Sequence, residues 1–242
     1  MIVDVHAHIG AFAYGLRTSQ TADRLIELMD KHGVDVSAIS QLSTNMAVDN
    51  DAVSQAVKRY PDRLVGYAHI DPRDVDLALH EVDRCLRDLG LTGVKMHSNF
   101  DHFVPFDDDV LRVMDRISSY QVPVLFHTAE EYSRPLQIAY VAREFPKVPV
   151  ILGHFGYIAS LEVIPAAKLS DNVYLETSIH GEMPVYEEAI HRVGADRVLF
   201  GTDTPYGNHA VELKKIEVLN ITVEDRKKIL GENARKILRL KP

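Results

Sequence analysis

The chain has 242 residues, of which 46% are hydrophobic and 26% are charged, with a net charge of −8 and a pI near 5.8. This composition is typical of a globular protein, and the acidic balance argues against binding to nucleic acid or to an anionic membrane surface. Cys85 is the only cysteine, so no intrachain disulfide can form. With no basic start and no uncharged run of about 18 residues, the sequence predicts a cytoplasmic protein without a membrane span.

The first predicted strand covers residues 1–9 and places Asp4, His6 and His8 on one face, because strand side chains alternate with a period of two. A polar loop of residues 10–20 follows, and then a helix between a capping Thr21 and Gly33. Apolar runs and helical stripes alternate from there to the end of the chain. We expect further strands at 34–40, 63–70, 93–97, 123–128, 148–154, 173–178 and 197–203, and helices at 49–60, 75–89, 107–117, 136–145, 161–169, 186–193, 213–219 and 222–240.

Eight strands, each followed by a helical segment, predict a parallel sheet, and eight such units near 250 residues have the size of a (β/α)₈ TIM barrel. An open, doubly wound sheet is the alternative. No linker or change of composition divides the chain, so we expect one domain over residues 1–242.

Barrel enzymes carry their active sites at the carboxyl ends of the strands. Five of the predicted strands end in side chains that are costly to bury without a partner. Convergent histidines and carboxylates mark metal or catalytic sites, so this pattern predicts one. The side chains concerned are His6 and His8, Lys95 and His97, His127, His154, and Asp203.

The same segments resemble the motifs of the amidohydrolase superfamily, in particular its amidohydrolase-related branch of metal-dependent hydrolases and decarboxylases. The resemblance runs nearly end to end, although each motif alone is weak. It rests on DVHAH at 4–8, GVKMH at 93–97, VLFHT at 124–128, ILGHFG at 151–156, VLFGTDTP at 198–205 and the tail ILGENARKIL at 229–238.

The resemblance implies that His6, His8, His127 and Asp203 hold one divalent metal, with zinc favoured and a second ion left open. Three nitrogens and a carboxylate leave room for a water whose pKa the metal lowers. Asp203 would handle the proton of that water. His154 would contact the substrate or a second metal.

The same resemblance allows two roles for Lys95. When carboxylated, it would bridge two metal ions. As an ammonium group, it would meet an anionic substrate or pair with Asp203. Further substrate contacts are expected from His97 and from residues on the loops at the mouth of the barrel: Arg17, Arg134, Tyr157 and Tyr206.

We therefore expect a hydrolase that cleaves a small, anionic ester, lactone or amide. A non-oxidative decarboxylase of a small unsaturated or aromatic acid uses the same ligands and is the first alternative. A non-catalytic, metal-containing barrel that binds a ligand is the second. A TatD-type deoxyribonuclease fits less well, because that group carries a glutamate where this chain has Lys95. The sequence leaves the oligomeric state open, with a homodimer as one alternative.

Overall fold

The computed structural model of the protein describes residues 1–12, 18–43, 45–129 and 131–241. Its central feature is an eight-stranded parallel sheet in which each strand pairs with the next one along the chain. The strands are shorter than the apolar runs that predicted them. They are β1 (Val3–His8), β4 (Val36–Ser40), β5 (Leu64–His69), β6 (Gly93–Met96), β7 (Val124–Phe126), β8 (Val150–Leu152), β9 (Val173–Glu176) and β10 (Val198–Leu199).

Hydrogen bonds between the first and last strands close the sheet. The Val5 amide donates to the Phe200 carbonyl (3.0 Å), and the His8 amide donates to the Thr204 carbonyl (2.8 Å). Ala7 and Thr204 also form a parallel bridge. The predicted (β/α)₈ barrel is confirmed, and the open sheet is excluded.

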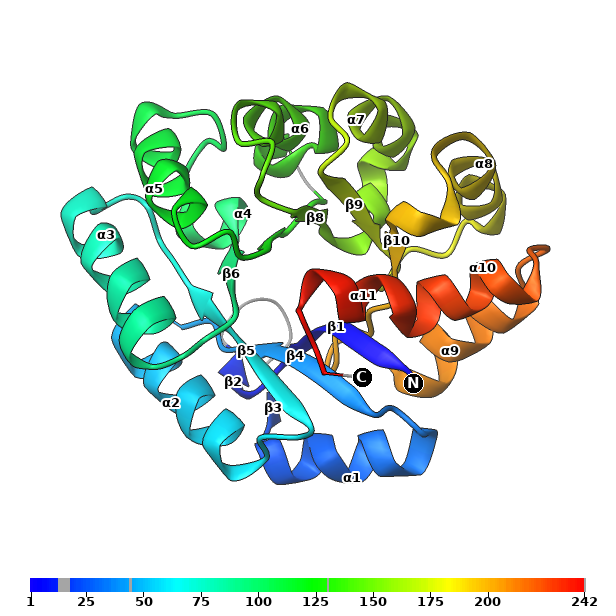
Figure 1. The fold of residues 1–242 in the computed structure, drawn as a ribbon, viewed down its shortest axis with the longest axis horizontal. Coiled ribbons are helices and arrows are strands. Elements are labelled where there is room, and N and C mark those ends of the chain that lie inside the picture. The colour runs from blue at the N-terminus through cyan, green and yellow to red at the C-terminus, as the bar shows by residue number, and fades with distance from the viewer. Residues whose placement is uncertain (13–17, 44, 130, 242) are drawn as a thin grey trace.

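Helices surround the barrel, as Figure 1 shows. Figure 1 also shows the last helix lying across one opening, beside the amino terminus. The α-helices are α1 (Ala22–His32), α2 (Met46–Arg59), α3 (Val75–Asp83), α4 (Ser98–Asp101), α5 (Asp108–Ser118), α6 (Pro135–Glu144), α7 (Val163–Leu169), α8 (Met183–Val193), α9 (His209–Val218), α10 (Val223–Lys227) and α11 (Asn233–Ile237).

Local signals set the helix ends. The Thr21 hydroxyl accepts a hydrogen bond from the Arg24 amide, and Gly33 ends α1 in the left-handed region with φ of 70°. Helix α2 begins three residues before its predicted start, because the Asn45 side chain accepts from the Val48 amide and caps it there. The predicted loop 10–20 instead contains a short antiparallel pair, β2 (Gly10–Phe12) and β3 (Thr18–Gln20).

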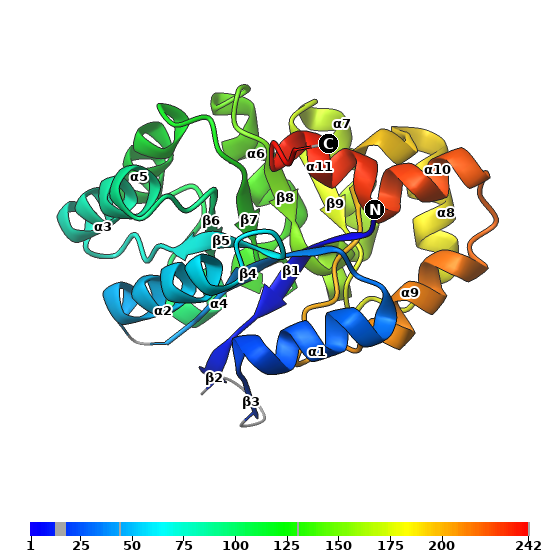
Figure 2. The same cartoon turned by 60° about the horizontal axis from the view of Figure 1, so that its bottom comes forward.

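Apolar side chains fill two regions. One lies between the sheet and the helices, and the other lies inside the barrel, where Val5, Tyr67, Leu125 and Ile151 pack together. Ala234 and Leu238 join the inner cluster from the carboxyl-terminal segment. Figure 2 places α11 and the amino terminus together, at the end of the barrel from which β1 starts. That end is therefore covered, and the opposite end carries the polar side chains.

Replacing Gly93 with alanine is expected to destabilise the barrel by about 1–3 kcal/mol through overpacking. A Cβ at this position would lie 2.5 Å from Cε1 of the fully buried Tyr67. Gly181→Ala is the matched control, because a Cβ there meets nothing within 4 Å. Urea denaturation of the two variants measures the difference, and equal midpoints would contradict the packing described here.

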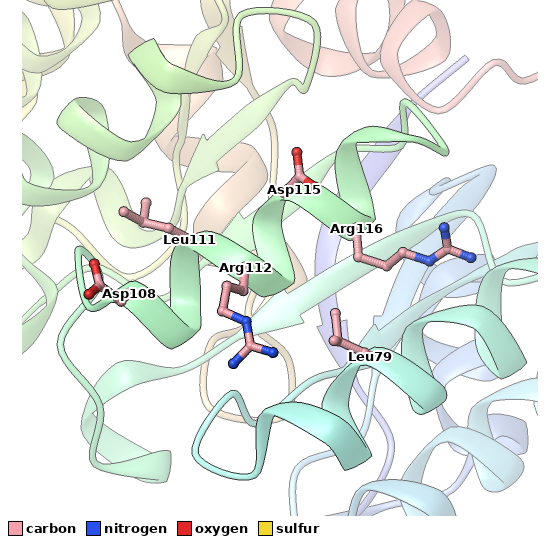
Figure 3. A pocket seen from close by; sticks show the side chains of 6 residues that line it. All are labelled: Leu79, Asp108, Leu111, Arg112, Asp115 and Arg116. Carbon is pink, nitrogen blue, oxygen red and sulfur yellow. The ribbon is translucent and has the colours of Figure 1, made fainter.

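A depression open to solvent lies in the outer layer between α3 and α5. Figure 3 shows the side chains that line it, Leu79, Asp108, Leu111, Arg112, Asp115 and Arg116, and none of these six is a candidate residue of the predicted site. Among the helices in the described ranges, each is too short or too polar to cross a membrane.

Candidate metal centre

His6, His8 and Asp203 meet at the carboxyl end of the barrel. The two histidines are the last alternate residues of β1, and Asp203 follows β10 in a left-handed conformation with φ of 51°. The Asp203 amide donates to the His6 carbonyl (2.6 Å), which brings its side chain beside β1. All three side chains are buried.

Three potential ligand atoms form a nearly equilateral triangle. His6 Nε2 and His8 Nε2 are 3.2 Å apart, His8 Nε2 lies 3.0 Å from Asp203 Oδ1, and His6 Nε2 lies 3.3 Å from the same oxygen. Ligand atoms bound about 2.1 Å from one zinc-like ion are about 3.0–3.4 Å apart. The triangle therefore matches one face of the coordination shell of a divalent metal.

Hydrogen bonds on the far side of each ring orient these histidines. His6 Nδ1 lies 2.9 Å from Glu176 Oε2, and His8 Nδ1 lies 3.0 Å from the Ser40 hydroxyl. When Nδ1 of His6 donates to the carboxylate, Nε2 carries the lone pair that a metal needs. Burial lowers the pKa of His6 well below its ordinary value, so the ring is neutral as a ligand must be.

The surroundings shift the pKa values of the two acids of the site in opposite directions. Burial opposes the ionised form of Asp203, but His154, His8 and Lys95 together hold its pKa below the ordinary value. Burial raises the pKa of Glu176 to about 8, although the amides of His154 and Ser178 donate to it and oppose that shift. Asp203 is thus the carboxylate suited to a metal.

His127, the fourth ligand expected from the resemblance, lies beside this triangle, and its role as a ligand stays a prediction. Among the described residues, potential ligand atoms form two groups, His6–His8–Asp203 and His6–His154–Glu176, and His127 belongs to neither. Its Nδ1 lies 3.0 Å from His154 Nε2, and its ring stacks on that of His97 with centroids 3.7 Å apart. His154 also bonds the Ser178 hydroxyl through Nδ1 (2.9 Å), so these histidines form a second layer beside the triangle.

Lys95 reaches the triangle from β6. Its Nζ lies 3.1 Å from His6 Nε2, and the side chain is fully buried. Burial lowers the pKa of this ammonium group to about 8, against the attraction of Asp203 and Glu176. The expected ion pair between Lys95 and Asp203 does not form, since no carboxylate of the described residues lies within ion-pair distance of Nζ.

The loop residues proposed as substrate contacts differ in where they lie. Arg134 is exposed, and its Nε donates to Glu162 (2.8 Å). Tyr157 is partly exposed on the segment that follows β8. The Tyr206 ring lies 6.5 Å from the His8 ring, next to the triangle. Arg17 is outside the described residues.

Asp4 does not share the surroundings of His6 and His8, although simple strand alternation places it on their face. The pairing of β1 with β4 shifts register between Asp4 and Ala7, and such a bulge reverses the facing of the residues beyond it. Asp4 accepts from the Thr202 hydroxyl (2.6 Å) and the Thr202 amide (3.0 Å). It therefore anchors the segment that leads to Asp203.

Ser178 and Ser40 were not predicted as site residues, and Glu176 was expected either to support the ligands or to be a core acid paired with an arginine. Each supports a histidine through a ring nitrogen or a backbone amide. The only available signal was that Glu176 falls at the carboxyl end of a strand, as the predicted ligands do. Their partners are as many as 170 positions away in the sequence, so the contacts themselves could not be read from it.

A further buried cluster lies beside the site, at the ends of β5 and α4. His69 Nδ1 lies 3.3 Å from Asp49 Oδ2, and His69 Nε2 lies 3.0 Å from Asp101 Oδ2. Burial alone would lower the pKa of His69, but the hydrogen bonds and charges of Asp101 and Asp49 outweigh it and raise the pKa to about 9. The ring is therefore an imidazolium at neutral pH.

This imidazolium makes the stability of the protein depend on pH. A pKa raised from 6.5 to about 9 contributes about 3 kcal/mol that is fully present below pH 6.5 and lost as the pH rises through 9. The free energy of unfolding of wild type minus that of Asp101→Asn should therefore shrink between pH 6 and pH 9.5. The contributions of other titrating groups to the free energy of unfolding cancel in this difference. A constant difference would show that His69 is neutral throughout.

The comparisons with known proteins point to decarboxylases. A gamma-resorcylate decarboxylase of Polaromonas sp. (strain JS666) is 25% identical over 286 aligned positions, which cover 90% of this chain and 87% of the relative. The crystal structure of 2,6-dihydroxybenzoate decarboxylase from Rhizobium matches with a TM-score of 0.82 at 20% identity, covering 99% of this chain and 98% of that one.

A dihydroxybenzoic acid decarboxylase from Polaromonas sp. JS666, solved with manganese and the inhibitor 2-nitroresorcinol, also has a TM-score of 0.82 at 20% identity, covering 99% and 97% of the two chains. The hydrolase expected from the sequence is wrong, because these relatives are decarboxylases. The amidohydrolase family model matches residues 3–240, nearly the whole chain. The chain therefore belongs to the amidohydrolase family.

Proposed function

We propose that this protein is a metal-dependent decarboxylase that removes CO₂ from a small hydroxylated aromatic acid without an oxidant. The observation that carries the proposal is the His6–His8–Asp203 triangle in a chain similar over 90% of its length to a gamma-resorcylate decarboxylase. The metal-containing but non-catalytic barrel is the second candidate, and the assay below distinguishes the two.

In this proposal His6, His8 and Asp203 hold the divalent metal, and His127 and His154 stand beside it. A bound divalent ion acts as a Lewis acid toward the oxygens of the substrate. Manganese is the first ion to test because a structural relative contains it, while zinc stays a prediction. The number of ions, a carboxylated Lys95, a homodimer and a cytoplasmic location also stay predictions.

Lys95 is assigned to the substrate carboxylate. No carboxylate in the part of the chain that the structure describes lies within ion-pair distance of its buried ammonium group, which is 3.1 Å from a proposed ligand atom. A buried cation of this kind is stabilised when an anion binds next to it. An acid held at the metal thus also reaches Lys95.

The reaction needs one proton at one carbon. The bond between the ring and the carboxylate breaks, its electron pair stays on the ring carbon, a proton adds there, and CO₂ leaves. Asp203 and His154 are the groups assigned to hold and move that proton, since both lie buried next to the triangle. Glu176 and Ser178 keep His6 and His154 in place. His97 and Tyr206 are assigned to contact the substrate.

The test is an assay of manganese-loaded protein with 2,6-dihydroxybenzoate and 5-carboxyvanillate, following CO₂ release and the decarboxylated phenol. We expect turnover with at least one of these acids and its loss after chelation. Binding of an acid without CO₂ release would favour the non-catalytic barrel. Acid release from lactones or esters, with no CO₂ from either benzoate, would contradict the proposal.

A further inference from the structure

We propose that Asp49, His69 and Asp101 form a clamp that holds α4 in place and, through α4, fixes His97 against His127. We call these three residues the His69 clamp. Because His97 is assigned to contact the substrate, the inference rests on the proposed function. His69 and Asp101 are then positioning residues for a site that they do not touch.

The clamp joins three elements that are distant in sequence. Asp49 comes from α2, His69 ends β5, and Asp101 ends α4. Both ring nitrogens of His69 face carboxylate oxygens, at 3.3 Å and 3.0 Å, so both must carry protons to bond them. The Asn50 side chain holds the backbone of His69 on both sides, accepting from its amide (2.7 Å) and donating to its carbonyl (3.0 Å). These hydrogen bonds therefore fix the position of both the backbone and the ring of His69.

Helix α4 needs such an anchor. It has only four residues, and a single helical turn is unstable by itself because nucleation costs more than one hydrogen bond returns. Two side chains secure it: Asp101 binds His69, and His97 Nδ1 accepts from the Phe100 amide (3.2 Å). The Phe100 ring is near both histidines, with its centroid 6.3 Å from that of His69 and 6.0 Å from that of His97.

Helix α4 is linked to the candidate site through His97. The His97 ring stacks on His127 at 3.7 Å with an angle of 13° between the planes, and His127 Nδ1 lies 3.0 Å from His154 Nε2. A shift of α4 would therefore move a ring in direct contact with the histidine layer beside the triangle. Placement within a fraction of an ångström matters at such sites.

The clamp also explains a cavity without assigning it a ligand. A cavity of about 250 Å³ is lined by His69, Phe100 and Asp101, with Arg73 and Asp71 among its other residues. Both ring nitrogens of His69 and both carboxylate oxygens of Asp101 are already used by the clamp. Arg73 is likewise bound to Asp71 (2.6 Å). These polar groups around the cavity thus bond to one another.

The experiment compares three variants of the full chain. Asp101→Ala breaks the link to α4, Asp101→Asn keeps an acceptor oxygen at the same place, and Asp49→Asn removes an equal charge from the side of the clamp that does not touch α4. The first readout needs no activity: imidazole ¹H signals of His97 and His127, assigned from single His→Gln variants, are shifted by the ring currents of the stack.

We expect Asp101→Ala to lose those shifts, Asp101→Asn to recover most of them, and Asp49→Asn to retain them. With 2,6-dihydroxybenzoate, or whichever acid the assay identifies, KM should rise about tenfold in Asp101→Ala with kcat nearly unchanged. Unchanged ring-current shifts in Asp101→Ala would overturn the clamp whatever the activity of the protein. Lost shifts with unchanged KM would overturn its role in substrate binding. A failed decarboxylation assay would leave the spectroscopic test standing.

Discussion

Asp203→Asn is expected to reduce kcat by on the order of 10³-fold, because one residue supplies both a proposed metal ligand and a group that moves the proton. The amide has nearly the same shape, so the hydrogen bond from the Asp203 backbone amide to His6 (2.6 Å) should survive. The neutral oxygen cannot replace the charge beside His8 at 3.0 Å. Steady-state CO₂ release at saturating manganese measures the loss.

The matched control for this variant is Asp62→Asn, which makes the same chemical change at an exposed position after α2. It should leave kcat unchanged. If Asp203→Asn retained kcat within about tenfold of wild type, the assigned proton role would be wrong, because general acid–base groups contribute at least 10²-fold.

Lys95→Met is expected to raise KM for the acid by about 10- to 100-fold, the loss that follows when a charged hydrogen bond is removed. Methionine keeps the length and apolar stem of the side chain, so the barrel core should remain filled. The variant should also bind manganese at least as tightly, because a positive charge 3.1 Å from His6 Nε2 is gone. Calorimetric titration measures that affinity.

The same variant tests the other reading of Lys95. A carboxylated lysine that bridged two ions would make metal content fall when it is replaced. A loss of bound manganese in Lys95→Met would therefore contradict the ammonium role, as would an unchanged KM.

The barrel could be predicted because each strand is a short apolar run between turn signals, as in Val124–Phe126. Strand length was harder to predict. Strand β10 ends at Leu199, because the Phe200 amide donates to the Ile229 carbonyl (3.0 Å) in the last helical segment rather than to a neighbouring strand. That contact depends on the folded position of residues near the chain end. One domain over the whole chain stays a prediction.

Within the site, the positions of residues that end strands follow from the barrel, whereas the orientations of loop residues do not. The barrel topology alone brings His6, His8 and Asp203 to one end, so alternation and strand order were sufficient. The orientation of Arg134 depends instead on Glu162, which lies 28 positions later. The facing of Asp4 depends on a bulge that carries no glycine or proline signal.

The choice of reaction could not be made from the residues. Hydrolysis and decarboxylation by this family use the same histidines and aspartate, so the ligand pattern does not distinguish the two reactions. Similarity over the length of the chain, including the segments between motifs, favoured decarboxylation. The His69 clamp could not be predicted from the sequence either. Aspartates usually lie at the surface, and only the fold shows that Asp49 and Asp101 are buried.

We propose that one divalent metal binds to His6, His8 and Asp203, and anomalous diffraction from a manganese-loaded crystal would locate that ion. We predict a peak about 2.1–2.3 Å from His6 Nε2, His8 Nε2 and Asp203 Oδ1. A peak bound instead between His97, His127 and His154, with the triangle left bare, would contradict it.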